Sequence, residues 1–334
     1  MQTHLSVVHF QRKPVDGNHS IERMYSDIRN HFPSDIQSRL RINIYPSRGF
    51  LPRLIDSFFS IFDQGDINHI TGDIHYLTFF LRKNKTILTI LDCVSIERLT
   101  GFKRSLFIFL WYWLPVKCSA RIVVISESTK NELQRYISCD SDKIKIIYCP
   151  LSETFKFHQK TFNKSKPRIL QIGTFENKNL PRLFHALTGI PCTLSIIGKL
   201  SNHHIQMLKK LNIDFENYFN LSDEDLLYEY VKCDLLSFIS LYEGFGLPII
   251  EANAVGRPVV TSNIFSMPEV AGNAALFVDP YNVEAMRAAF VELINNDRKR
   301  EQLIENGLSN ITRFNLKTIS SMYVELYRDL YDEK

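Results

Sequence analysis

The sequence lacks the features expected of a secreted or membrane-spanning protein. Its six cysteines are scattered and include no CxxC pair, which argues against a disulfide framework and against a cysteine-ligated zinc site. The N-terminal stretch MQTHLSVVHF has no basic segment followed by a long apolar run, so no signal peptide is predicted. No stretch reaches the roughly 18 apolar residues that a spanning helix needs. We therefore expect a cytoplasmic protein.

Net charge is also small, but it is unevenly distributed. The whole chain carries a formal +4. Residues 1–166 hold 24 Lys and Arg against 15 Asp and Glu, whereas the remainder holds 16 against 21. A basic half can face phosphates, a nucleic acid or an anionic membrane, or can simply be a solvated surface. Because the basic residues are not concentrated around aromatic platforms, we do not expect a nucleic-acid partner.

The longest apolar run is LFIFLWYWLPV, at 106–116, which is too short to span a bilayer and contains Pro115. A buried amphipathic helix is the ordinary interpretation of such a run. The alternative is a peripheral surface that touches a membrane or a lipid-linked substrate. Basic residues flank the run on both sides and keep this alternative open: Lys103, Arg104, Lys117 and Arg121.

Short apolar runs alternate with helical patterns along the whole chain. Predicted strands span 5–10, 40–45, 67–72, 86–91 and 121–126, and then 168–173, 193–198, 213–217, 233–240, 258–262 and 274–280. This alternation predicts an α/β protein with two doubly wound, Rossmann-like domains. We assign 1–160 to the first domain and 165–314 to the second, with a polar linker at 143–167. An amphipathic helix at 315–334 completes the chain and can cross back to the first domain.

The stretch EGFGLPIIE begins where the predicted strand 233–240 ends. Gly244 and Gly246 allow positive φ and a close approach of backbone to a ligand. Pro248 suits the first turn of a helix, and Gly256 suits the position just after its end. A strand, a glycine turn and a helix N-terminus form a site for an anion such as phosphate.

Two carboxylates, Glu243 and Glu251, bracket this turn. A carboxylate beside phosphate would repel it, so its natural role is to accept hydrogen bonds from neutral hydroxyls. A ligand with hydroxyls at both ends and phosphates between them is a nucleotide sugar. The alternative is a pair of surface glutamates near the start of a helix.

The run from Glu243 to Asn282 resembles the signature of the retaining glycosyltransferases of family 4, which have the two-domain GT-B fold with a central cleft. The family pattern of two glutamates separated by seven residues, a GxPV turn, a PEV segment and a DP pair is matched in order at 243–251, 256–259, 268–270 and 279–280. The resemblance implies that Glu251 holds the ribose hydroxyls and that Glu243 and Gly244 lie by the donor sugar. It places the backbone of Phe245, Gly246 and Leu247 against the sugar and diphosphate.

The segment LQIGTFENKNL resembles the first strand, turn and helix of the family's donor domain. The resemblance implies that Gly173 lies at the turn and that Lys178 binds the donor diphosphate. Many members carry an arginine where this chain has Thr174, which we still assign to the donor-binding residues. Lys199, after SIIG, is a candidate second cation, and a solvated lysine is the alternative.

The resemblance is weaker in the N-terminal half. It implies that Gly17 lies in a loop covering the diphosphate and sugar, and that His75 contacts a sugar, although packing is the commoner fate of a single histidine. Many members place a histidine in the position of Leu91, beside Asp92. Ser126 and Glu127 match a family strand end, and we expect them to be mainly structural.

Together these features predict a hexosyltransferase-type enzyme that transfers a sugar, with retention, from a nucleoside-diphosphate sugar to a glycan or lipid-linked acceptor in bacterial polysaccharide assembly. Glu243, Lys178 and His75 form the expected catalytic set. No cofactor and no metal are expected, and the DxD spacing at 140–142 lies in a polar connection. The alternatives are a nucleotide-sugar-binding GT-B module with little activity, or a nucleotide-sugar epimerase. Peripheral attachment at the inner face of the plasma membrane fits the same assignment.

Overall fold

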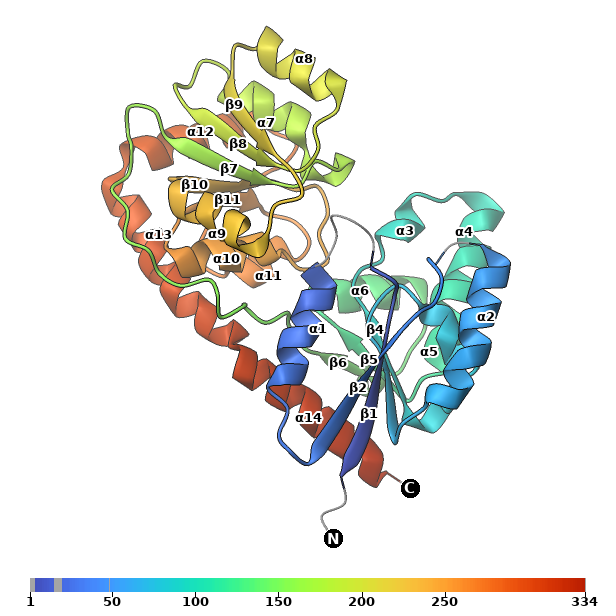
Figure 1. The fold of residues 1–334 in the computed structure, drawn as a ribbon. Helices are drawn as coiled ribbons and strands as arrows, with labels where there is room; N and C mark the ends of the chain where they lie inside the picture. Colours follow the sequence, from blue (N-terminus) through green and yellow to red (C-terminus); the bar gives the residue numbers. More distant parts are fainter. Residues whose placement is uncertain (1–3, 15–19, 48, 334) are drawn as a thin grey trace. The chain divides into compact units, whose positions relative to one another are not determined.

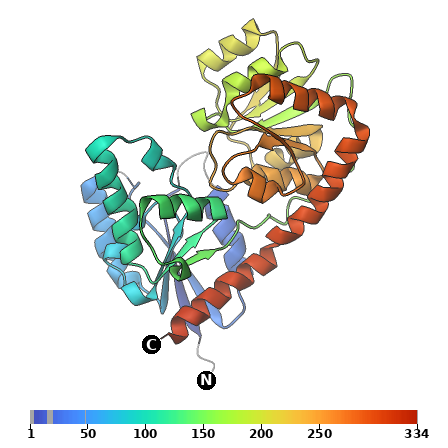
Figure 2. The same cartoon turned by 180° about the vertical axis from the view of Figure 1, so that it is seen from behind.

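The computed structural model describes residues 4–14, 20–47 and 49–333, and the chain divides into two units. The first unit comprises residues 1–150 and 316–334, and the second comprises Leu151–Asn315. Each unit holds one six-stranded sheet (Figures 1 and 2). All of the paired strands run parallel. The predicted α/β class is thus confirmed.

The sheet of the first unit has the order β2-β1-β3-β4-β5-β6. Its strands are β1 (Leu5–Gln11), β2 (Ile36–Ile42), β3 (Ile67–Ile70), β4 (Thr86–Ile90), β5 (Arg121–Val124) and β6 (Ile144–Ile146). Its helices are α1 (Ser20–Asn30), α2 (Phe50–Ser60), α3 (Val94–Glu97), α4 (Gly101–Ile108), α5 (Leu114–Lys117), α6 (Glu127–Tyr136) and α14 (Leu316–Asp332). Short helical turns are η1 (Ile61–Asp63), η2 (His75–Phe79), η3 (Lys83–Lys85), η4 (Phe109–Trp113) and η5 (Ser141–Lys143).

Two strands of this sheet differ from the sequence prediction. The second strand covers Ile36–Ile42 rather than 40–45, and β6 begins inside the segment predicted to be linker. Both are edge strands, bonded to one neighbour each. Most side chains of β2 are exposed, and four of its seven residues are polar, so the strand shows no apolar run. A prediction built on buried apolar runs therefore misplaced β2 and missed β6.

The two faces of the first sheet have different chemistry, because successive side chains of a strand point to opposite sides. Apolar side chains of β1, β3, β4 and β5 pack with η2, α5 and α6 on one face. The other face carries His9, His69 and Thr89, covered by α1 and α14. The Tyr327 hydroxyl of α14 lies 2.7 Å from His69 Nδ1 and 3.0 Å from His9 Nε2. A buried polar network thus fastens helix α14 to this sheet.

This histidine network predicts a loss of stability in mild acid. Burial lowers the pKa of His69 from 6.5 to about 3 and also lowers that of His9, which Arg29 and His69 depress further. Both rings stay neutral in the folded state, while the unfolded chain binds protons below its pKa of about 6.5. Stability is therefore full above that pH and falls as pH drops, by about 1.4 kcal/mol per pH unit for each histidine.

Urea unfolding at pH 7.5 and pH 5.0 measures this slope above the range in which most carboxylates titrate. We expect His69→Gln to lower stability at pH 7.5 and to make its pH dependence shallower. The exposed His31 supplies the matched control, because His31→Gln should lower stability at pH 7.5 far less than His69→Gln. A His69→Gln protein with the wild-type slope would contradict the assignment.

The sheet of the second unit has the order β12-β11-β10-β7-β8-β9. Its strands are β7 (Arg168–Ile172), β8 (Thr193–Ile197), β9 (Asp214–Tyr218), β10 (Leu235–Phe238), β11 (Val259–Ser262) and β12 (Leu276–Val278). Its helices are α7 (Leu180–Leu187), α8 (Asn202–Lys210), α9 (Asp223–Lys232), α10 (Leu247–Val255), α11 (Met267–Ala271), α12 (Val283–Asn295) and α13 (Asp297–Asn310), with turns η6 (Glu176–Lys178) and η7 (Ile311–Phe314).

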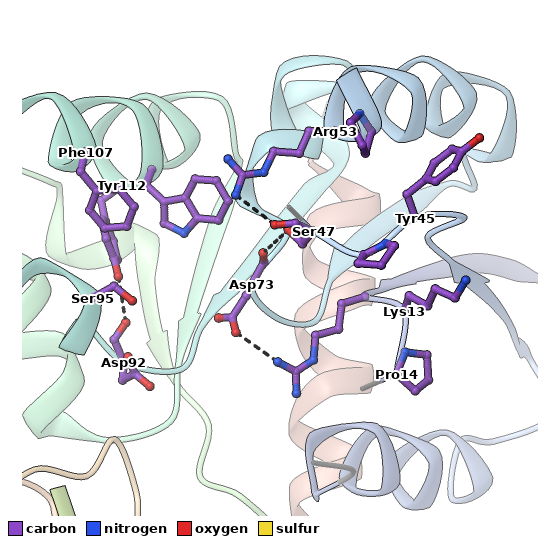
Figure 3. Close-up of a pocket in the computed structure, with 14 residues that line it drawn as sticks. Lys13, Pro14, Tyr45, Ser47, Arg53, Asp73, Asp92, Ser95, Phe107 and Tyr112 are labelled. Carbon is purple, nitrogen blue, oxygen red and sulfur yellow. Dashed lines mark hydrogen bonds and ion pairs between the residues drawn. The ribbon is translucent and has the colours of Figure 1, made fainter. Parts of the chain in front are cut away.

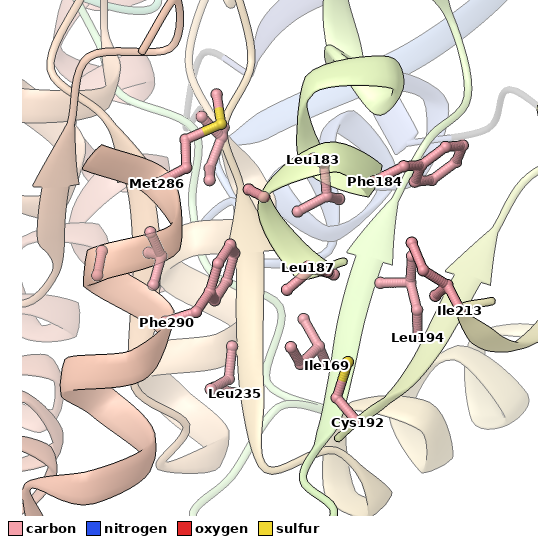
Figure 4. Close-up of a cluster of buried hydrophobic side chains, with 14 of the residues drawn as sticks. Ile169, Leu183, Phe184, Leu187, Cys192, Leu194, Ile213, Leu235, Met286 and Phe290 are labelled. Atoms are coloured by element: carbon pink, nitrogen blue, oxygen red, sulfur yellow. The ribbon is translucent and has the colours of Figure 1, made fainter. Parts of the chain in front are cut away.

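The core of the second unit lies between its sheet and helices α7 and α12. Leu187 from α7 and Phe290 from α12 meet Ile169 of β7 and Leu235 of β10 (Figure 4). All four are completely or almost completely buried. This packing holds β7 and β10 in the core, and the turns that follow these strands carry the residues predicted to bind the donor.

The apolar segment at 101–117 is only partly buried. It forms α4, a wider π-helical turn η4, and α5. Tyr112 and Val116 enter the core, whereas Phe102, Leu110 and Trp113 remain exposed. The prediction of a buried helix is thus correct for one side of this segment, whereas its other apolar side is exposed to solvent. None of the helices described is long and apolar enough to cross a bilayer.

Candidate functional site

The glycine turn between β10 and α10 is held by backbone conformation and by one serine. Gly246 has a φ of +116° at the N-cap of α10, and a Cβ there would lie 3.2 Å from Ile249 Cδ1. The Ser266 hydroxyl lies 2.9 Å from the carbonyl oxygen of Glu243 and 2.6 Å from that of Phe245. Gly244, in contrast, is not among the described glycines with positive φ. Of the two glycines predicted to need a positive φ, only Gly246 has one.

Helix α10 begins directly after this turn and has no side-chain cap on its first amides. Pro248 stands in its first turn, and Gly256 closes it with a φ of +78°, as predicted from the sequence. The positive end of the helix dipole and its exposed N–H groups favour an anion here. Leu247 and Pro248 are partly exposed, so this end is accessible.

Lys178 and Glu243 meet beside the turn. Lys178 Nζ lies 2.5 Å from Glu243 Oε1, and both side chains are largely buried. Asn177 Nδ2 donates to the same Glu243 oxygen at 3.2 Å and to the carbonyl of Tyr242 at 2.9 Å. The Lys178 ammonium also lies 4.5 Å from the centre of the Phe238 ring. A cation and a carboxylate are thus held in one orientation at the carboxyl ends of β7 and β10.

Gly173 makes room for Lys178. It has a φ of +88°, and a Cβ would lie 2.7 Å from Lys178 Cε. The Lys178 side chain therefore passes directly over Gly173, and a Cβ on any other residue at that position would displace the lysine. The structure brings Gly173, Lys178 and Glu243 together in the second unit, although they come from two separate segments.

Glu251 lies one turn inside α10 and is 7% exposed. The hydroxyl of Tyr230, on α9, donates to Glu251 Oε2 at 2.6 Å. Tyr230 is itself completely buried and packs edge-on against Phe155. This support fixes the orientation of a carboxylate that would otherwise rotate, as suits an acceptor for hydroxyl groups.

Thr174 and Lys199 join the turns that follow β7 and β8. The Thr174 hydroxyl donates to the carbonyl of Lys199 at 2.9 Å. Thr174 is therefore used to connect two loops and supplies no charge, while the Lys199 side chain is exposed. A phosphate contact by either residue stays a prediction.

The predicted residues of the first unit have different surroundings. His75 is 3% exposed, its Nδ1–H donates to the carbonyl of Trp111 at 2.8 Å, and burial lowers its pKa. These contacts are those of a packing residue and give no support to a sugar contact. Leu91 is buried, Ser126 caps α6 as a structural residue, and Gly17 lies outside the described residues.

A polar pocket of about 820 Å³ lies at the carboxyl ends of β1 to β4 in the first unit. The Arg12 guanidinium pairs with Glu22 at 2.8 Å and with Asp73 at 3.3 Å. Figure 3 shows the contacts along one wall, from Arg53 through Ser47 to Asp73. The position of the polar pocket agrees with the rule that ligands of such sheets bind beyond the carboxyl ends of the strands.

Three supporting residues were not found from the sequence: Asn177, Tyr230 and Ser266. Asn177 stands directly before Lys178, so its position could have suggested a role, but its contact is to a residue 66 positions away. Tyr230 and Ser266 carry no motif. Among the described residues, no group of three or more His, Cys, Asp or Glu side chains could hold a metal.

Comparisons with known proteins agree with this geometry. Residues 152–309 match the family model of glycosyl transferases group 1. The chain is 40% identical over 230 residues to O-antigen chain mannosyltransferase B of Escherichia coli, covering 62% of this chain and 60% of that protein. It is 26% identical to the serotype-specific mannosyltransferase WbdA of Escherichia coli, covering 61% of this chain and 28% of that protein. The match thus spans less than two thirds of either relative.

The fold itself is shared with solved glycosyltransferase structures. The Anabaena HepE structure in complex with UDP and glucose superposes with a TM-score of 0.79 at 14% identity, over 98% of this chain and 100% of that one. The chain therefore has the GT-B fold.

Proposed function

We propose that the protein is a retaining glycosyltransferase of family 4 that transfers a sugar from a nucleoside-diphosphate sugar to a hydroxyl of a glycan in bacterial polysaccharide assembly. The single observation that carries the proposal is the placement of Lys178 and Glu243 beside the uncapped N-terminus of α10. The family match of residues 152–309 and the relatives named mannosyltransferases support the same reaction class. They make a mannose nucleotide the first donor to test.

In this proposal the residues act through charge and position. The diphosphate leaving group lies at the α10 N-terminus, and Lys178 neutralises the charge that develops as the sugar–phosphate bond breaks. Glu251 accepts hydrogen bonds from the ribose hydroxyls, and Glu243 accepts them from the donor sugar. The acceptor hydroxyl attacks the same face of the sugar, and the leaving phosphate takes its proton. Positioning and electrostatic stabilisation suffice without an enzymic nucleophile.

A ligand screen followed by turnover tests the proposal. We expect one nucleoside diphosphate, and its mannose derivative, to raise the melting temperature by binding the folded state. Release of that diphosphate should then require a glycan acceptor and should persist in EDTA, because Lys178 and the helix terminus supply the positive charge. Binding without turnover on cell-derived glycan acceptors would favour the binding module. Product formed without any acceptor would favour the epimerase.

A further inference from the structure

A second hollow lies beside the polar pocket in the first unit and shares a wall with it. This apolar groove, of about 500 Å³, runs between α2 and the α4–η4 segment. Leu54, Phe80, Leu106 and Leu110 line it, whereas the polar pocket is lined by Arg12, Lys13 and Asp73. Arg53, Phe107 and Trp111 line both. A polar and an apolar compartment thus meet at three side chains.

Arg53 lies at the junction of the two compartments. Its guanidinium carbon is 4.7 Å from the centre of the Trp111 ring, and its Nη2 donates to the carbonyl of Ser47 at 3.0 Å. Among the described residues, neither Arg53 Nε nor Arg12 Nη2 has a hydrogen-bond partner, although both atoms are buried. Buried guanidinium donors are costly unless an acceptor completes them. Phosphate oxygens match their geometry and charge.

The apolar groove is open to solvent. Leu54 is 43% exposed, and Leu106 and Leu110 are each 44% exposed. Contiguous apolar surface of this kind marks a binding site when it is rimmed by polar groups, and here Lys103 stands at its edge. The π-helical turn over Phe109–Trp113 forms part of this wall, and such turns occur often at functional sites.

The geometry points to one amphiphilic ligand, with an aliphatic chain in the apolar groove and a phosphate-bearing polar head in the polar pocket. The shared wall fits a single molecule that changes from apolar to anionic at Arg53. This assignment builds on the proposed function, in which the ligand would be the acceptor. A bilayer surface would instead engage protruding side chains such as Phe58 and Phe102, which lie outside the groove.

Tryptophan fluorescence can detect this ligand directly. The chain has two tryptophans, so Trp113→Phe leaves Trp111 as a single reporter at the shared wall. Titration with dodecyl phosphate, below its micellar concentration, should shift Trp111 emission to shorter wavelength. We expect dodecyl phosphate to bind at least 100-fold tighter than inorganic phosphate, because each buried methylene contributes roughly fourfold. Equal affinities, or an unchanged emission spectrum, would overturn the proposal.

Matched variants separate the groove from the surface around it. Leu54→Glu and Leu110→Glu place a charge inside the groove at exposed positions, and each should weaken dodecyl phosphate binding at least tenfold. Phe58→Glu changes a residue of the same helix as Leu54 that lies outside the groove and is more exposed, at 53% against 43%, and it should change binding less than twofold. Equal losses at Leu54 and Phe58 would indicate a bilayer-docking surface and overturn the proposal. A dimer that dissociates in Leu54→Glu would overturn it as well.

Arg53→Gln tests the head group. It should reduce the preference for dodecyl phosphate over dodecyl maltoside at least fivefold, and an unchanged preference would remove the phosphate from the assignment. All of these measurements omit the donor. A failed titration therefore leaves the glycosyltransferase proposal intact, and a protein that binds dodecyl phosphate without transferring sugar would contradict only the proposed function.

Discussion

Replacing Glu251 with glutamine should weaken binding of the nucleoside diphosphate by about 30- to 100-fold. Hydrogen bonds to a charged group contribute roughly 1.5–3 kcal/mol, and each 1.4 kcal/mol is about a tenfold change in affinity. The substitution keeps the shape of a 7% exposed side chain and the helix around it, while it removes the carboxylate that accepts ribose hydroxyls. Isothermal titration with the diphosphate found in the ligand screen measures the effect.

Two further variants make the Glu251 result interpretable. Tyr230→Phe removes only the 2.6 Å hydrogen bond that orients the carboxylate, so we expect a smaller loss of about fivefold. Glu301→Gln, at an exposed position of α13, should leave the affinity unchanged. If Glu251→Gln bound the diphosphate as tightly as the wild type, the ribose assignment would be wrong.

Replacing Lys178 with methionine should lower kcat by about 10²- to 10³-fold with a much smaller change in donor affinity. Removing one group that stabilises charge in the transition state typically costs this much, and charge on the diphosphate is greatest as the sugar leaves. Methionine preserves the apolar stem that crosses Gly173. Single-turnover kinetics at saturating donor and acceptor separate chemistry from binding.

The control for this substitution is Lys210→Met, an exposed lysine at the end of α8, which should retain full activity. The salt bridge adds a second expectation, because Lys178→Met leaves the Glu243 carboxylate without its cation. A double variant with Glu243→Gln should therefore lose less than the sum of the two single losses. A kcat for Lys178→Met within threefold of the wild type would refute the role at the diphosphate.

The part of the site that could be predicted from sequence is the part written in consecutive residues. The roles of Gly246, Pro248 and Gly256 depend on the local backbone conformation. Their spacing alone therefore predicts the turn, the helix start and the helix end. Burial of Ile169 and Leu235 likewise follows from short apolar runs, which placed β7 and β10 correctly.

What could not be predicted depends on contacts between distant segments. Asn177, Tyr230 and Ser266 act through hydrogen bonds to residues 66, 21 and 23 positions away, and nothing near them in sequence signals these partners. The sugar contact of His75 stays a prediction, because a single histidine looks the same in a sequence whether it meets a ligand or, as here, a backbone carbonyl. The exposed polar side chains of β2 shifted its predicted bounds for a related reason, since this edge strand carries no buried apolar run.

The packing of α14 against the first sheet has a consequence for how the protein folds during its synthesis. The second unit is one continuous stretch, Leu151–Asn315, whereas the first is built from both ends of the chain. During synthesis the first 150 residues emerge early but cannot complete the His9–His69–Tyr327 network until the last helix has left the ribosome. Domains generally fold as they are synthesised, so here the unit made first is finished last. Nascent chains that stall before Leu316 should therefore carry a folded second unit and an incomplete first one.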